Sequence, residues 1–466
     1  MFELSTLGIA IICALGTLLG AFWYRDTLHP LVYTMPMVAF MYVIQPYQLT
    51  RDEALHVWFS TAELNFVQGL NLACIATFFL GTLVGSKGLR RNSKRLDVFS
   101  AFSSRQWRDR LFWAAVALGG LALTLYAYGL SNVGGFLAAY DSPKGGGWAG
   151  SGYLRDFTIL SIPAIVLLFM SRQGAKFRSW DYMLLFSFLL PLLIHGLLSA
   201  RRGPTFMGIV ALVAGWYLSR NLRPSLWRVL SGGALVGFLL LALVTFRGEI
   251  YLGSAFFSEE TPSTGQVVEK AFSETTEMEG GNEFVYGTYT VVAANEKENF
   301  YWGRRYLTHL FVRPIPSSIW PTKYQDVGMG GLVTNAGTLI ESSSPIYDEL
   351  PLGAAPGFVG DLFVEFQWGA AAATFVFGWF FAFGWRRMIT HGGLWTPIYT
   401  VQMALSLYLI SQTVEAVLVR FLVIVVPTSL AWLYFRPPYI SDLQKAGFSF
   451  PSSSSQKQVP GGGVHV

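Results

Sequence analysis

Three arginines flank apolar segments of the chain, where a positive charge can face a membrane surface or a ligand. Arg201 and Arg202 come just before the apolar segment 204–219, and Arg247 comes directly after the apolar segment 229–246. A guanidinium binds phosphate oxygens through charge-assisted hydrogen bonds, each of which contributes roughly 1.5 to 3 kcal/mol. These arginines therefore predict a site for a phosphorylated ligand. The alternative is that they extend to the phosphates of the surrounding lipid.

A short stretch, residues 301–314, brings two further arginines next to a histidine. Its pattern predicts a helix that ends at Pro314. Arg305, His309 and Arg313 share one face of that helix, because residues four positions apart are neighbours. The two cations should lower the pKa of His309 and keep it neutral at pH 7, so that it can accept a proton. The alternative is a solvated basic stripe that contains an incidental histidine.

Two carboxylates lie near the start of the apolar segment 357–384. Asp361 and Glu365 are four residues apart, so both side chains should lie on one face of a helix. Acidic residues in a membrane helix are costly unless they have a function. We therefore treat both as candidate functional residues. Compensation of the helix dipole is a simpler explanation for Asp361 than for Glu365.

Aromatic side chains accompany these charged residues. Tyr301 and Trp302 precede Arg305 directly, and Trp320 follows a few residues after Pro314. Such rings can stack on sugar rings, and they can equally anchor a segment at the membrane interface.

The sequence contains no recognisable metal or cofactor site. Its six histidines include no His-x-x-x-His pair. No Gly-x-x-x-x-Gly-Lys-Ser/Thr loop occurs, and neither does the Asp-x-Asp motif that holds a divalent cation for nucleotide-sugar transfer. We therefore expect no metal and no cofactor, and we expect no use of ATP or nucleotide sugars.

The composition identifies the elements that must position these residues. Of the 466 residues, 52% are hydrophobic and only 13% are charged, and the mean hydropathy is +0.43. The apolar residues form blocks of about twenty, the length of a helix that crosses a bilayer. The sequence thus predicts an all-α, polytopic transmembrane helical bundle and excludes a soluble enzyme. Nucleic acid is not an expected partner, because the net charge of +5 lies largely in short loops, where it sets orientation.

About eleven spans are predicted. They cover residues 5–24, 30–49, 66–86, 111–130, 153–171, 181–199, 204–219, 229–246, 357–384, 395–411 and 416–435. Residues 1–247 thus hold the first eight helices, residues 248–356 form one large extracytoplasmic loop, and residues 357–436 hold helices nine to eleven. The tail, residues 437–466, is predicted to be cytoplasmic and disordered. A loop as long as 248–356 is usually functional.

The distribution of basic residues predicts the orientation of the bundle. The loop 87–110 carries eight Lys and Arg residues against two Asp residues, which places it in the cytoplasm. Alternation of the spans then puts four further basic groups on the same side: 172–178, 220–228, 386–387 and the tail after residue 436. The amino terminus and the large loop fall on the outer side.

Four stretches of the chain resemble the Wzy-type O-antigen and oligosaccharide repeat-unit polymerases of bacterial inner membranes. The number of helices and the late external loop are similar as well. Members of that family often have a basic residue directly after Ile-Pro, whereas serine follows here. The stretches are residues 199–205, 246–249, 315–323 and 357–369.

The resemblance implies polymerisation of undecaprenyl-diphosphate-linked repeat units outside the cytoplasmic membrane, with a large periplasmic loop and a cytoplasmic carboxyl terminus. A flippase and a chain-length regulator are implied partners, beside the membrane lipid. On this basis His309 is the expected base, with Asp361 and Glu365 as alternatives. Sugars are expected at Tyr301, Trp302 and Trp320, and the lipid diphosphate at Arg201, Arg202, Arg247, Arg305 and Arg313.

Two other functions fit the same sequence. An O-antigen ligase uses the same lipid donor and delivers its glycan to lipid A core. A transporter or flippase of lipid-linked sugars would also be polytopic and would carry charged residues in its spans, such as Glu415 and Arg420. No internal repeat is apparent in the sequence, which disfavours the transporter.

Overall fold

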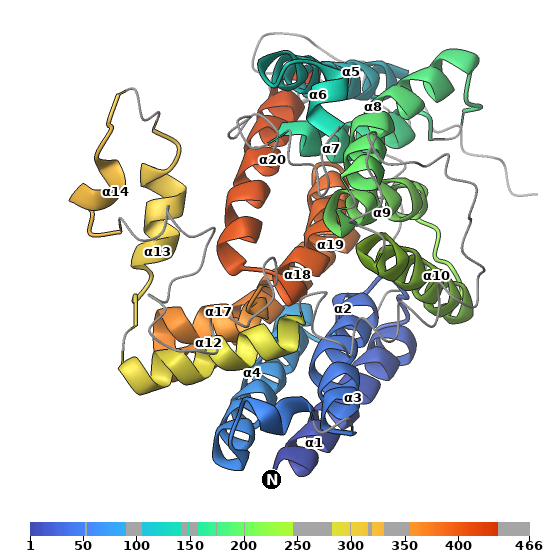
Figure 1. Cartoon of the computed structure of the whole chain (residues 1–466). Helices are drawn as coiled ribbons and strands as arrows, with labels where there is room; N and C mark the ends of the chain where they lie inside the picture. Colours follow the sequence, from blue (N-terminus) through green and yellow to red (C-terminus); the bar gives the residue numbers. More distant parts are fainter. Residues whose placement is uncertain are drawn as a thin grey trace, which may run out of the picture.

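The computed structural model shows a bundle of helices (Figure 1). No strand occurs in the part of the chain that the structure describes, which confirms the all-α prediction. The described ranges are residues 1–51, 54–89, 105–140, 148, 157–173, 175–199, 201–245, 282–298, 300–315, 319–329 and 355–436.

The first half of the chain supplies the helices α1 to α10. Two π-helical turns interrupt the early helices, at Leu19–Trp23 after α1 and at Phe40–Ile44 after α2, and a 3₁₀ turn at Ala54–Val57 precedes α4. The helices are α1 (Phe2–Leu18), α2 (Pro30–Ala39), α3 (Gln45–Arg51), α4 (Thr61–Ser86), α5 (Arg105–Asn132), α6 (Phe136–Tyr140), α7 (Ser161–Ser171), α8 (Ser179–Leu198), α9 (Arg202–Ser219) and α10 (Leu226–Thr245).

The second half contains the short helices of the large predicted loop and then the last long helices. A π-helical turn at Thr308–Val312 follows α13, and a 3₁₀ turn at Gln367–Gly369 separates α17 from α18. The helices are α12 (Glu283–Lys297), α13 (Arg304–Leu307), α14 (Lys323–Asp326), α17 (Gly357–Phe366), α18 (Ala370–His391), α19 (Trp395–Ser411) and α20 (Val414–Phe435).

Each of the eleven predicted apolar segments contains helix. Within the residues that the structure describes, six helical segments are long and apolar enough to cross a membrane, whereas Phe157–Ser171 and Leu226–Leu240 are apolar but shorter. The count of eleven spans therefore stays a prediction. The six are Phe2–Trp23, Thr61–Ser86, Arg105–Asn132, Ser179–Leu198, Gly357–His391 and Val414–Phe435.

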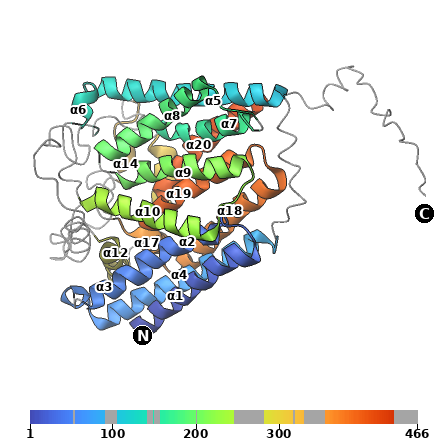
Figure 2. The ribbon, with the colours of Figure 1, turned by 90° about the vertical axis from the view of Figure 1, so that its right-hand side faces the viewer.

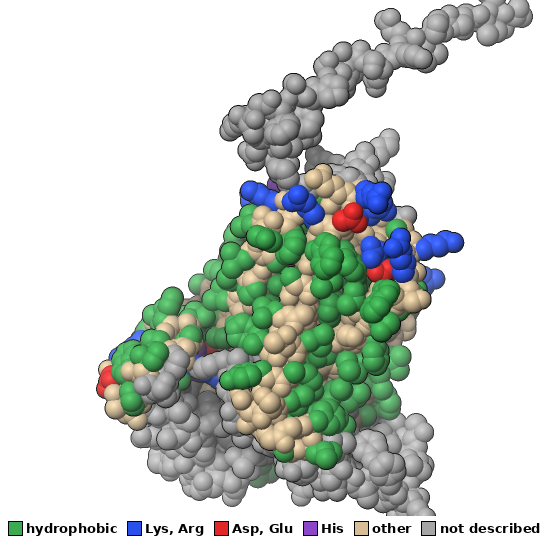
Figure 3. Space-filling view, turned by 90° about the horizontal axis from the view of Figure 1, so that it is seen from above, with side chains coloured by type: hydrophobic (Ala, Val, Ile, Leu, Met, Phe, Trp, Pro, Cys, Tyr) green, Lys and Arg blue, Asp and Glu red, His purple; other side chains and the backbone are tan. Residues whose placement is uncertain are grey.

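The outer helices expose hydrophobic stripes. On α1 the stripe recurs every three or four residues, and α20 carries a second one, so each helix turns one continuous apolar face outward. Figure 3 shows a broad hydrophobic area with Lys and Arg side chains gathered beside it at one end. A soluble monomer rarely exposes such a surface, which suits a surface covered by lipid. The stripe residues are Leu4, Leu7, Ile11, Leu15 and Leu18, and Leu422, Val426, Leu430 and Leu433.

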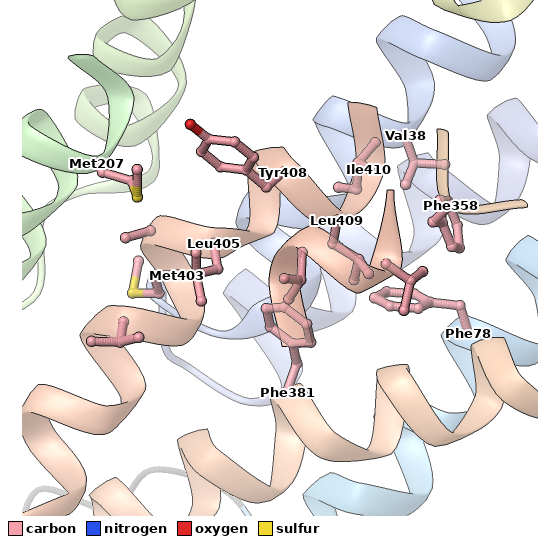
Figure 4. Close-up of a cluster of buried hydrophobic side chains, with 14 of the residues drawn as sticks. Val38, Phe78, Met207, Phe358, Phe381, Met403, Leu405, Tyr408, Leu409 and Ile410 are labelled. Carbon is pink, nitrogen blue, oxygen red and sulfur yellow. The ribbon is translucent and has the colours of Figure 1, made fainter. Parts of the chain in front are cut away.

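Glycines allow α4 and α18 to pack with their backbones close together. A Cβ atom at Gly81 would lie 2.0 Å from the carbonyl oxygen of Phe375, and one at Gly378 would lie 2.0 Å from that of Phe78. Close approach over small residues is typical of helix pairs in membranes. Beside this contact, Phe78 and the side chains of α2, α17, α18 and α19 form a buried cluster (Figure 4).

One end of the bundle is closed by a buried polar cluster. Arg223 pairs with Asp26, with 2.5 Å between Nε and Oδ1, and the indole nitrogen of Trp385 donates to the other Asp26 oxygen at 3.0 Å. His29 Nε2 lies 3.0 Å from the hydroxyl of Ser86. We call this the Asp26 end. It joins four segment ends that the charge pattern assigns to one side of the membrane.

The site described below lies at the opposite end of the long helices. Helix α9 starts at Arg202 and runs 18 residues toward Arg223, a length of about 27 Å at 1.5 Å per residue. Figure 2 shows the long helices side by side, with the short helices α3, α6 and α12 at the same end.

Candidate functional site

A broken helix builds the base of the site. The predicted span 357–384 is not continuous, because α17 ends at Phe366 and Gln367 adopts φ 52° and ψ −129° before α18 begins. The last carbonyls of α17 accept hydrogen bonds from the segment before α13: Tyr301 N donates to Val364 O at 3.1 Å, and Trp302 N donates to Glu365 O at 2.7 Å. These bonds satisfy carbonyls that a helix end leaves free, and they fix where α13 starts.

The predicted helix after residue 301 is present. Arg304–Leu307 is α-helical and Thr308–Val312 continues it as a π-helical turn, and the chain turns before Pro314. The nitrogen Nη1 of Arg313 lies 3.0 Å from Nδ1 of His309. The expected contact between these two side chains is therefore confirmed.

Arg305 is the centre of a buried ion cluster. Its side chain pairs with Asp361, its Nε donates to Glu365 Oε1 at 2.7 Å, and Glu415 Oε2 lies 3.6 Å from the same nitrogen. Three carboxylates thus share one guanidinium, so the four groups carry a formal charge of −2. The cluster joins α13, α17 and α20.

The two carboxylates of α17 have all their oxygens occupied. Asp361 Oδ2 accepts from the Tyr306 hydroxyl at 2.7 Å and from Val414 N at 2.8 Å, while Oδ1 accepts from Arg305. Glu365 Oε2 accepts from Gly303 N at 2.7 Å. Burial and the nearby Asp361 raise the pKa of Tyr306, so its hydroxyl keeps its proton and donates it.

This geometry bears on three of the expected roles. Asp361 and Glu365 are 0% exposed and fully hydrogen-bonded, so neither is placed to take a proton from a substrate. Arg305 is 2% exposed, and binding a diphosphate would require it to leave both partners. Removing one member of a buried ion pair is strongly unfavourable because the other charge is left uncompensated. In this structure the three side chains are held by one another and by their hydrogen-bond partners.

His309 lies where the sequence predicts it, between two cations. Burial, Arg313 and Arg305, in that order of effect, lower the pKa of His309 to about 4. The predicted neutral imidazole at pH 7 follows from this value. Its Nε2 lies 3.4 Å from Glu415 Oε2.

The sequence points to Glu415 only as a charged residue of a span and not as a member of this site. It is the second residue of α20, and its Oε2 atom is buried without a hydrogen-bond partner. The signal that could have identified it is positional. Its predicted span begins on the same predicted side as the span 357–384, which contains Asp361 near its start. Alternation of the predicted spans therefore brings both carboxylates to one end of the bundle.

The arginines at the start of α9 have different neighbours. Arg202 pairs with Glu283, which opens α12. Arg201 is the N-cap residue of α9. Next to them, a Cβ at Gly203 would meet the ring of Tyr408, and the guanidinium of Arg420 lies 4.5 Å from the centre of that ring. Arg247 lies outside the described residues.

The candidate sugar-binding aromatics differ in exposure. Trp302 is 64% exposed and adopts φ 53°, while Tyr301 packs partly against the buried core. Trp320 donates from Nε1 to Asp326 Oδ2 at 2.6 Å. Lys323 is buried and donates to the backbone oxygens of Arg313, at 3.1 Å, and of Ile315, so it ties this segment together.

Comparison of the chain with protein-family models, with curated proteins and with solved structures returned no match. Among the residues that the structure describes, no group of three or more His, Cys, Asp or Glu side chains is arranged to hold a metal ion. The function must therefore be argued from the site and from the sequence.

Proposed function

We propose that the chain polymerises undecaprenyl-diphosphate-linked oligosaccharide repeat units at the outer face of a bacterial inner membrane, in the synthesis of O-antigen or exopolysaccharide. The observation that carries the proposal is the group formed by Arg305, His309, Arg313 and Glu415. It joins the long segment between α10 and α17 to one end of an apolar helical bundle. A substrate carried on a membrane lipid presents its diphosphate at that depth.

The proposed orientation puts the Asp26 end in the cytoplasm and the Arg305 cluster in the periplasm. The basic residues beside the Asp26 end support it, because short cytoplasmic loops are enriched in Lys and Arg. The segment 248–356 is then periplasmic and the tail 437–466 cytoplasmic. A flippase that delivers the lipid-linked repeats and a chain-length regulator are the proposed partners.

The proposed reaction is a glycosyl transfer that needs no metal. An acceptor hydroxyl attacks the anomeric carbon, and the lipid diphosphate leaves with the electron pair of the broken bond. Cations near the leaving diphosphate stabilise the charge that develops on it. Arg313 is partly exposed and is the first candidate for this role, together with Arg201, Arg202 and Arg247. Trp302, Tyr301 and Trp320 remain candidates for contact with the sugar rings.

Replacement of Arg313 tests this proposal in cells. In a polymerase-null strain, we expect Arg313→Ala to leave only single repeats on the lipid A core, because the cation next to His309 is lost. Arg304→Ala is the matched control, since Arg304 is exposed in the same short helix. Long polymer at normal abundance from Arg313→Ala would refute the proposed role.

The same assay separates the polymerase from an O-antigen ligase. Loss of a polymerase leaves single repeats attached to the core, whereas loss of a ligase leaves the core bare. A strain that lacks this chain should therefore show core capped with single repeats. Bare core would exclude the polymerase and leave a ligase or a transporter.

A transporter of lipid-linked sugars is a second candidate, and the break between α17 and α18 favours it. Transporters often bind their substrates at interrupted helices that carry buried charges, and Asp361 and Glu365 lie directly before this break. Loss of a transporter would leave lipid-linked repeats on the cytoplasmic leaflet and no repeat on the core. The deletion strain thus distinguishes all three functions.

A further inference from the structure

We propose that Glu415 takes the proton from the attacking hydroxyl, and that His309 positions Glu415 instead of acting as the base. The inference rests on the proposed function, because it assigns roles within the same transfer reaction. It reverses the assignment that the sequence pattern favours.

The hydrogen-bond partners of His309 decide which nitrogen carries the proton. An arginine side chain only donates hydrogen bonds, so Nδ1 of His309 must accept from Nη1 of Arg313 at 3.0 Å. A neutral imidazole then has its single proton on Nε2, and Nε2 faces Glu415 Oε2 at 3.4 Å. Neither ring nitrogen has a lone pair free for a proton from a substrate.

The basicity of the ring supports the same conclusion. Burial and the two arginines lower the pKa of His309 to about 4. A general base works best when its pKa lies near the pH at which the enzyme operates. His309 is therefore a weak proton acceptor at neutral pH, although it stays uncharged.

Glu415 is the carboxylate of the cluster with an oxygen available. Asp361 and Glu365 are 0% exposed, and each of their oxygens accepts a hydrogen bond. The side chain of Glu415 is 13% exposed. Its Oε2 atom is buried and faces Arg305 and His309, so Oε1 is the oxygen left for a substrate proton. Because Arg305 is shared by three carboxylates, a proton on Glu415 reduces the formal charge of the cluster from −2 to −1.

The charged and titratable groups that face Glu415 come from four elements. The π-helical turn and α13 contribute His309 and Arg305, and α17 contributes Asp361 and Glu365. On α20 itself, Arg420 lies one turn further along, where its Nη1 donates to Ala416 O at 3.1 Å and its guanidinium covers the ring of Tyr408 from α19. Arg313 acts on Glu415 through its charge.

The proposed step balances in atoms and charge. The acceptor oxygen forms a bond to the anomeric carbon while its proton moves to Oε1 of Glu415. The bond from the anomeric carbon to the diphosphate oxygen breaks, and the diphosphate leaves with that electron pair. Glu415 then gives the proton to water, and no oxidant, reductant or further reactant is required.

Purified full-length protein in lipid nanodiscs, supplied with an undecaprenyl-diphosphate-linked repeat, tests the inference. We expect Glu415→Gln to lower kcat by about 100-fold to 10,000-fold, the usual contribution of a general base, with KM changed less than about threefold. Glu296→Gln is the matched control, because Glu296 is exposed on α12 and should behave as wild type. Glu415→Asp keeps the carboxylate and should be at least about tenfold faster than Glu415→Gln.

Two further experiments distinguish the roles of His309 and Glu415 from a purely structural role. They are the variant His309→Gln and the chemical rescue of Glu415→Ala. We expect His309→Gln to retain at least about tenfold more activity than Glu415→Gln and to shift the pH profile of kcat, because the imidazole only orients the carboxylate. Added formate should partly restore Glu415→Ala, since a small carboxylate can occupy the vacated space and accept the proton.

Two results would overturn the inference. One is a kcat for Glu415→Gln within about tenfold of wild type, and the other is a Glu415→Ala variant that formate does not restore. If wild-type protein released no undecaprenyl diphosphate at all, the proposed function itself would fail. Wild-type turnover that survives in Glu415→Gln would reject only the role of Glu415.

Discussion

Arg305 stabilises the fold through the carboxylates with which it pairs. It is buried between Asp361 and Glu365 and joins them to Glu415. Arg305→Ala leaves those carboxylates buried without their cation, so we expect the free energy of unfolding to fall by about 3 to 5 kcal/mol. The measurement is the thermal unfolding temperature in detergent. Arg304→Ala is the control, and an unfolding temperature of Arg305→Ala equal to that control would contradict this role.

His29 makes the stability of the fold dependent on pH. Burial lowers its pKa to about 3, whereas in an unfolded chain histidine titrates near pH 6.5. Between these values the unfolded state binds a proton that the folded state excludes, so stability falls as the pH decreases. We expect a loss of about 2 kcal/mol between pH 7 and pH 5 from this group.

The unfolding temperature measured at pH 7 and at pH 5 checks this prediction. His29→Gln should reduce the difference between the two values, because glutamine does not titrate. His56→Gln is the matched control, since His56 is exposed. An equal difference in wild type and in His29→Gln would show that another group controls the pH dependence.

At the scale of single residues, the sequence predicts local contacts better than distant ones. The contact between His309 and Arg313 follows from their spacing on a helix, and so does the lowered pKa of His309. Glu415 is more than 100 residues away from both in sequence. Its place depends on how α20 packs against the turn after α13, and no local pattern encodes that packing.

Among the contacts between helices, the one between α4 and α18 leaves the least room for a larger side chain. A Cβ at Gly81 would lie 2.0 Å from Phe375 O, so a larger residue must push the two helices apart. We expect Gly81→Leu to cost at least about 3 kcal/mol and to prevent stable assembly of the bundle. The yield of monodisperse protein after detergent extraction measures this effect.

Gly69 provides the control on the same helix. A Cβ at Gly69 meets nothing within 4 Å, so Gly69→Ala should leave the yield unchanged or raise it slightly. Normal yields from both variants would mean that α4 and α18 are not held together at Gly81.

The interruption between α17 and α18 could not be predicted from the sequence. Hydropathy predicts helix throughout residues 357–384, and nearly all of that segment is helical. The break occurs at Gln367, a residue type that does not indicate φ 52°. Hydrogen bonds from Tyr301 and Trp302, which are distant in sequence, hold the end of α17. The sequence therefore predicts the helix, while tertiary contacts determine its interruption.

For the whole molecule, the proposed orientation predicts which surfaces face each compartment. We expect a cysteine at Glu296→Cys to react with a membrane-impermeant maleimide in spheroplasts. One at Lys176→Cys should react only after the membrane is opened. Both positions are exposed, and the native Cys13 and Cys74 are buried, which keeps the background low. The reverse labelling pattern would place the Arg305 cluster in the cytoplasm and exclude the periplasmic reaction.

Composition and charge predict much of the whole-molecule arrangement. The all-α architecture and the apolar helices follow from blocks of about twenty hydrophobic residues. The basic-loop pattern also groups the segment ends that meet around Asp26. The partners of individual arginines do not follow in this way, since Arg202 and Arg305 bind carboxylates from remote helices. Charge patterns predict on which side of the membrane an arginine lies. Which carboxylate it pairs with depends on how the helices pack.

The most direct test of the central claim is the release of undecaprenyl diphosphate by the purified chain. Full-length protein in nanodiscs would receive a defined lipid-linked repeat in the presence of a metal chelator. The proposed polymerase should release one undecaprenyl diphosphate for each glycosidic bond formed and should yield a ladder of longer glycans on lipid. Repeats that stay single, with no undecaprenyl diphosphate released, would contradict the account.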